Sequence, residues 1–112
     1  MTNPAKRKGD AAELEAARIL ADLTGFPVRR KLGAGRADDT GDLHGIPECV
    51  VQVKSYASVT RATNDALNEL DAQRVNAGAT FAAAMIRKPG GRWFVAMSVD
   101  HFATLLREAT AP

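Results

Sequence analysis

Cysteine, aromatic residues and long apolar runs are all scarce in this 112-residue sequence. Cys49 is the single cysteine, which excludes an intramolecular disulfide and a zinc site built on cysteines, and indicates a reducing compartment. We interpret Cys49 itself as a small buried apolar residue. No apolar run approaches the roughly 18 residues that a membrane-spanning helix needs, and no signal-peptide core follows the basic N-terminus, so we expect a cytoplasmic protein.

The rest of the composition, 46% hydrophobic and 25% charged, is typical of a globular protein rather than a disordered or fibrous one. We therefore expect one domain over residues 1–112, in which residues 1–8 form a flexible basic arm. A chain of this length buries roughly 60 to 70% of its unfolded surface. Self-association would be a natural source of further stability.

Positive charge is concentrated towards the N-terminus. The net charge is only +2, but residues 1–36 contain eight Lys or Arg and four Asp or Glu, whereas residues 37–112 contain seven and nine. This asymmetry favours a polyanionic partner such as the DNA backbone. A solvated basic tail would give the same count, so charge alone leaves both interpretations open.

Hydrophobic periodicity and turn residues predict the element order αβββαββα, which indicates an α/β fold with a central mixed sheet flanked by helices. The turn at Gly45-Ile46-Pro47 separates the second strand from the third. The first helix is amphipathic, with an apolar side formed by Ala12, Ala16, Ile19, Leu20 and Leu23. The remaining predicted helices cover about 63–77 and 100–109, and the other strands cover 26–31, 49–54, 80–87 and 92–99.

The segment 49–54 is the strongest strand signal and should be the central strand. Side chains alternate along a strand, so Gln52 and Lys54 share one face, about 6.6 Å apart at roughly 3.3 Å per residue. Lysine is unusual in a central strand, although a strand end that reaches solvent would also explain it. Asp42 lies where a hairpin partner would bring its carboxylate beside both side chains. Two oxygen ligands with a lysine alongside are typical of a Mg²⁺ site facing a phosphodiester.

Glu13 is the second unusual carboxylate. The helical periodicity places it between Ala16, Ala17 and Leu20, in the apolar sector of the first helix. A buried charge without a partner is costly, so Glu13 should be paired, protonated or bound to a metal. A salt bridge to Arg30 at the helix end is the alternative to a metal.

Four short segments occur in a fixed order: Lys8-Gly9-Asp10-Ala11-Ala12-Glu13, Arg30-Lys31-Leu32-Gly33-Ala34-Gly35, Gly41-Asp42 and Gln52-Val53-Lys54. This ordered set resembles the signature of the PD-(D/E)XK nuclease superfamily, and within it the archaeal-type and phage Holliday junction resolvases. In that family a helix opens with Lys-Gly and a glutamate, an arginine precedes a Gly-Ser-Gly loop, and an aspartate leads to a Glu-Val-Lys strand. The resemblance spans residues 8–56, about half of the chain.

The resemblance implies a restriction-endonuclease-like core and a structure-selective endodeoxyribonuclease that depends on Mg²⁺, for which Mn²⁺ can substitute. Such an enzyme hydrolyses the phosphodiester with metal-activated water and needs no small-molecule cofactor. The resemblance also implies a homodimer that makes paired nicks in four-way junctions. The corresponding setting is DNA recombination and repair in a bacterial or phage-infected cell.

Carried over by position, Glu13 is the helix carboxylate near the metal and Asp42 is the principal metal ligand. Gln52 occupies the second ligand position, and Lys54 is the catalytic lysine. A further set of basic residues and glycines is expected to hold the DNA backbone without reading its sequence, and consists of Lys6, Arg7, Lys8, Arg29, Arg30, Lys31, Gly33, Gly35 and Arg36.

The sequence departs from the family pattern at two positions: Gln52 stands where the family usually has Glu, and Ala34 where it usually has Ser. A glutamine offers a carbonyl oxygen to a cation but carries no charge, so we expect weak metal binding. Three functions therefore remain open: a junction resolvase, a related nuclease for flaps, nicks or linear duplex, and a DNA-binding module without activity. The sequence does not decide whether Gln52 is natural or an engineered inactivating change.

Overall fold

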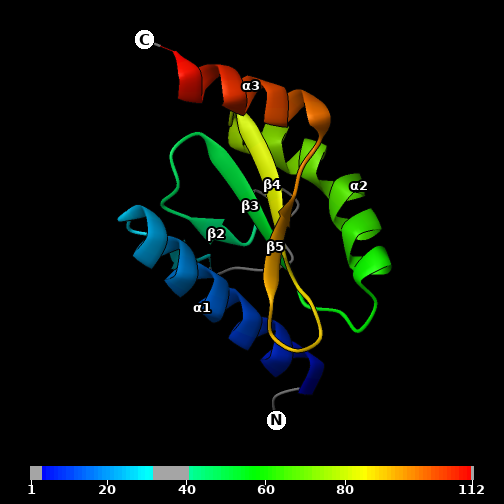
Figure 1. Ribbon diagram of the computed structural model, residues 1–112. Coiled ribbons are helices and arrows are strands. Elements are labelled where there is room, and N and C mark those ends of the chain that lie inside the picture. The colour runs from blue at the N-terminus through cyan, green and yellow to red at the C-terminus, as the bar shows by residue number, and fades with distance from the viewer. Residues whose placement is uncertain (1–3, 32–40, 112) are drawn as a thin grey trace.

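The computed structural model describes residues 4–31 and 41–111, with side chains from residue 8 onward, and contains a five-stranded mixed sheet and three helices (Figure 1). Over these residues the predicted order αβββαββα and the α/β class are confirmed. The elements are α1 (Pro4–Thr24), β1 (Arg29–Arg30), β2 (Leu43–His44), β3 (Cys49–Lys54), α2 (Val59–Ala77), β4 (Phe81–Arg87), β5 (Trp93–Ala96) and α3 (Val99–Thr110).

The strands are ordered β1-β2-β3-β4-β5, so β3 is the central strand, as predicted. β3 and β4 are parallel, with Gln52 opposite Ala84, and α2 forms the crossover between them. The other pairs are antiparallel, including β4 and β5, which form a hairpin. On the other side of β3, Leu43 of β2 pairs with Val51. This register places Asp42, one residue earlier in the chain, level with Gln52.

The two faces of the sheet are covered by different helices. On one face the alanines of α1 pack against residues in and beside the strands. The resulting cluster consists of Ala12, Ala16, Ala17, Val28, Leu43, Val51, Val53 and Met85. On the other face α2 packs against a cluster formed by Val50, Ala62, Ala66, Leu70, Ala82, Ala84 and Ile86. Alanine dominates the contact positions of both helices, which lets the helices approach the strands closely. β3 is consequently buried on both faces, and Gln52 is only 4% exposed.

Helix α1 begins earlier than predicted, and one residue of its expected apolar side is exposed. It begins at Pro4, so residues 4–8, expected as a flexible arm, are part of the helix, while residues 1–3 lie outside the described residues. Proline is well suited to the first helical position, and a glycine inside a helix costs only about 1 kcal/mol, so Gly9 does not interrupt it. Leu23, expected on the apolar side, is 79% exposed. The last turn of α1 therefore extends past the sheet.

The other two helices begin slightly earlier than predicted. Ser58 caps α2, and its Oγ accepts a hydrogen bond of 3.2 Å from the Arg61 amide. Gly78, at φ 65°, ends α2 as expected. α3 is capped by Ser98, and Asp100 lies in its first turn. In Figure 1, α3 lies across the end of the sheet where β4 begins. Among the described residues, no helix combines the length and apolarity that a membrane crossing requires.

Candidate functional site

Asp42 is held against β3 by both its backbone and its side chain. Its amide donates to Val51 O (2.9 Å), and its carbonyl accepts from the Lys31 amide (2.8 Å). Its carboxylate oxygen Oδ2 accepts a 2.7 Å hydrogen bond from the Val53 amide. β2 covers only two residues, so this carboxylate takes the place of a strand partner for β3. Asp42 thus lies beside the central strand, where the hairpin prediction put it.

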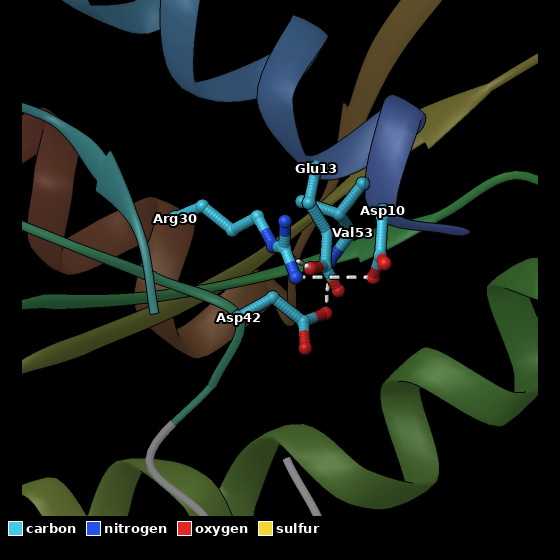
Figure 2. Close-up of polar contacts among 5 residues, drawn as sticks. All are labelled: Asp10, Glu13, Arg30, Asp42 and Val53. Atoms are coloured by element: carbon cyan, nitrogen blue, oxygen red, sulfur yellow. Dashed lines mark hydrogen bonds and ion pairs between the residues drawn. The ribbon is translucent and has the colours of Figure 1, made fainter. Parts of the chain in front are cut away.

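Glu13 lies next to Asp42 and is paired with an arginine. Arg30 donates from Nε to Glu13 Oε1 (3.0 Å) and from its terminal nitrogen to Asp10 Oδ1 (3.1 Å). Figure 2 shows the Arg30 guanidinium facing the two acidic side chains of α1, with the Asp42 carboxylate and the Val53 amide beside them. Of the alternatives for Glu13, the structure contains the salt bridge. Arg30, expected to contact phosphate, neutralises carboxylates here.

The electrostatics of Glu13 reflect this crowded position. Partial burial raises the pKa of Glu13, the charges of Asp42 and Asp10 raise it further, and Arg30 lowers it. The net direction is upward. The proton on Glu13 is therefore held more tightly than on an exposed glutamate, and a nearby cation would favour its loss.

Gln52 and Lys54 point towards α2 and meet the same carboxylate there. Oε2 of Glu69 accepts hydrogen bonds from Gln52 Nε2 and from Lys54 Nζ, the latter at 3.1 Å. Burial by itself lowers the pKa of Lys54, but the hydrogen bond and charge of Glu69, with a contribution from Tyr56, raise it more, and the net shift is upward. Lys54 is therefore positively charged at neutral pH.

All four predicted catalytic residues line one cavity of about 420 Å³. Glu13 comes from α1, Asp42 from the segment before β2, and Gln52 and Lys54 from β3. The complete lining is Lys8, Gly9, Ala12, Glu13, Asp42, Gln52, Val53, Lys54, Ser55 and Tyr56. Three segments that are distant in the sequence thus converge at one place.

The oxygen chemistry of this cavity suits a hard divalent cation. Asp42 and Glu13 supply carboxylates. Gln52 Oε1 is buried and has no hydrogen-bond partner among the described residues, although its Nε2 is bonded. A carbonyl oxygen in that state is available as a ligand. In the described part of the chain, no three His, Cys, Asp or Glu side chains form a metal-binding group, so the set is two carboxylates and an amide oxygen.

Sequence reasoning missed three residues around the cavity: Asp10, Tyr56 and Glu69. Asp10 lies three residues before Glu13, on the same side of α1, so helical spacing could have revealed it. The centroid of the Tyr56 ring lies 5.6 Å from Lys54 Nζ and 6.0 Å from the Arg61 guanidinium, within the range of cation–π contacts. Glu69 had no local signal, because the part of α2 that lies over Gln52 depends on how the helix packs.

The predicted DNA-binding residues are not all at the cavity. Lys8 is exposed and lines it, whereas Lys31 lines a separate cavity of about 220 Å³ with residues of β2, β3 and the end of α2. Arg29 is exposed in β1. The side chains of Lys6 and Arg7 are not described, and Gly33, Gly35 and Arg36 lie outside the described residues.

No protein-family model matches the chain, and no curated protein or solved structure matches it either. The functional assignment therefore depends on the residues and geometry above.

Proposed function

We propose that this chain is a divalent-metal-dependent, structure-selective DNA endonuclease with a restriction-endonuclease-like core, and that it acts as a homodimer to nick four-way junctions in pairs. The observation that carries the proposal is the single cavity that contains Glu13, Asp42, Gln52 and Lys54. These are the positions at which the sequence resembles the resolvases.

The residues divide into those that hold a cation and one that acts on the phosphate. Asp42, Glu13 and Oε1 of Gln52 would hold Mg²⁺ or Mn²⁺ through oxygen. When bound, such an ion polarises a phosphoryl oxygen and lowers the pKa of water. Lys54 keeps its proton at neutral pH, so its charge stabilises the negative charge that develops on the phosphate. Lys8 lines the cavity and would contact the DNA backbone.

A second candidate function is a DNA-binding module without cleavage. The ion pairs of Arg30 with Glu13 and Asp10 support it. In this arrangement part of the acidic charge is already neutralised, and Gln52 adds none. Cleavage then requires a cation to compete with Arg30 for Glu13. A nuclease for flaps, nicks or linear duplex would use the same cavity, and only the choice of substrate separates it from a resolvase.

The experiment compares a four-way junction with its linear arms, in Mg²⁺ and in EDTA, by gel analysis of the products. We expect paired nicks in the junction with Mg²⁺ and none in EDTA. Asp42→Asn and Lys54→Ala should each abolish nicking and largely preserve DNA affinity. The exposed Asp100→Asn and Lys88→Ala are matched controls that should cleave normally.

Unchanged cleavage in both cavity variants would refute the nuclease assignment at this cavity. Junction binding without cleavage in either Mg²⁺ or Mn²⁺ would support the binding module. Cleavage of linear arms as fast as of the junction would support the general nuclease. Sedimentation analysis of the protein with the junction measures whether two copies bind.

A further inference from the structure

Gln52 is a buried polar side chain whose two ends have different surroundings. It lies in the central strand and is 4% exposed. Its Nε2 donates to Glu69 Oε2, whereas Oε1 has no partner among the described residues. A buried acceptor without a partner has lost its hydrogen bonds to water and gained none in exchange, so a glutamine in this state is unfavourable for packing alone. Gln52 lines the same cavity as Asp42 and Glu13, which indicates a ligand for the free oxygen.

Glu69 determines the orientation of the Gln52 amide. A carboxylate only accepts hydrogen bonds, so the amino end of the Gln52 amide must face it. If the amide were turned around, Oε1 would meet Oε2 of Glu69, and two acceptors would repel each other. Lys54 reinforces the arrangement, because its Nζ donates to the same Glu69 oxygen at 3.1 Å and holds the carboxylate in place.

We propose that Glu69 is a positioning residue that fixes the Gln52 amide with Oε1 towards the cavity, so that this oxygen serves as a neutral ligand for a divalent cation. The inference rests on the metal-dependent function proposed above. It explains how a glutamine can replace a carboxylate as a ligand. A carboxylate can bind a cation with either of its oxygens, whereas an amide must be turned so that its one oxygen faces the cation. The Glu69 side chain is 46% exposed, and among the described residues it is not part of the cavity lining.

The test is a double-mutant comparison of Mn²⁺ affinity, measured by isothermal titration calorimetry on the full chain. Glu69→Gln replaces the carboxylate with an amide of equal size, to which either end of Gln52 can bond. We expect it to weaken Mn²⁺ binding by about two- to tenfold, the range of one neutral hydrogen bond. Asp71→Asn, which removes an exposed carboxylate from the same helix, controls for the loss of charge and should have little effect.

The same Glu69→Gln substitution is then made together with Gln52→Glu. A carboxylate at position 52 has two equivalent oxygens and needs no orientation, and it would be repelled by Glu69. In this background Glu69→Gln should leave Mn²⁺ affinity unchanged or increase it. This difference between the two backgrounds is the result that a merely structural or long-range charge effect would not produce. Circular dichroism of each variant checks that the fold is retained.

Two outcomes overturn the inference, and they are distinguishable. If Asp42→Asn abolishes Mn²⁺ binding but Glu69→Gln has the same effect in both backgrounds, Glu69 does not orient the amide, and the proposed metal site stands. If the unmodified chain does not bind Mn²⁺, or Asp42→Asn leaves binding intact, the metal site itself is wrong and the inference fails with it.

Discussion

Replacement of Gly41 by alanine should destabilise the protein and displace Asp42, the residue that follows it. Gly41 is buried at φ 97°, and an added Cβ would come within 2.7 Å of Val50 Cγ1 and 3.1 Å of Val51 O. Val51 belongs to the central strand, and its carbonyl accepts the Asp42 amide, so neither neighbour moves easily. The backbone conformation and the close contact therefore act together.

Two other glycines separate these contributions. Gly90 has nearly the same φ, 95°, but open space around its Cβ position. Gly90→Ala should cost about 0.5 to 2 kcal/mol, since strain of about 1 to 3 kcal/mol is offset by the reduced entropy of the unfolded chain. Gly41→Ala adds overpacking of about 1 to 3 kcal/mol, for a total of about 1.5 to 5 kcal/mol. Gly9→Ala, in a helix with no nearby atoms, should stabilise by about 0.5 to 1 kcal/mol.

The measurement is the free energy of unfolding in urea for all three variants. A domain of this size is stable by about 5 to 15 kcal/mol, so Gly41→Ala should still fold and can be tested for Mn²⁺ binding. We expect the order of stability Gly9→Ala, unmodified protein, Gly90→Ala, Gly41→Ala, with weaker Mn²⁺ binding only in the last. If Gly41→Ala costs no more than Gly90→Ala, the close approach of Gly41 to the central strand is refuted. The position of Asp42 against that strand is then refuted as well.

Three further predictions concern burial and charge. Burial raises the pKa of the Cys49 thiol from 9.0 to about 11. At pH 8 its reaction with an aromatic disulfide reagent should therefore be on the order of 100-fold slower than that of a free thiol with the ordinary pKa. Unfolding in urea should remove the difference. Ile86→Ala in β4, where the side chain is fully buried, should cost about 2 to 5 kcal/mol in urea unfolding; a cost below 1 kcal/mol would contradict the packing. The pKa of Glu13, followed by NMR titration, should lie above 4.5 and rise further in Arg30→Met, because Arg30 lowers it; no change would show that the ion pair is absent in solution.

The secondary structure was largely predictable, because periodicity and turn residues are properties of neighbouring positions. The valines of Cys49–Lys54 identified the central strand, and Gly78 marked the end of α2. The boundaries were less predictable. Helix α1 continues through Gly9 to Pro4, since one glycine is a small cost in a helix that buries an alanine face against the sheet.

The candidate site was partly predictable for a similar reason. Strand alternation and the short hairpin were enough to bring Asp42, Gln52 and Lys54 together, and helical periodicity marked Glu13 as a buried carboxylate. Which group would balance each charge was not predictable. The ion pair of Glu13 with Arg30 was one of several possibilities, and the pairing of Lys54 with Glu69 was not anticipated.

Local sequence thus specifies which residues point the same way along one strand or one helix, because side-chain direction follows from backbone geometry alone. It does not specify what lies opposite them, since that depends on which helix covers each face of the sheet and at which turn. The burial of Gln52 beneath α2 and the contact of its amide with Glu69 arise only from that packing. The face on which a strand residue lies is determined locally, whereas the groups that surround that face are determined by the tertiary structure.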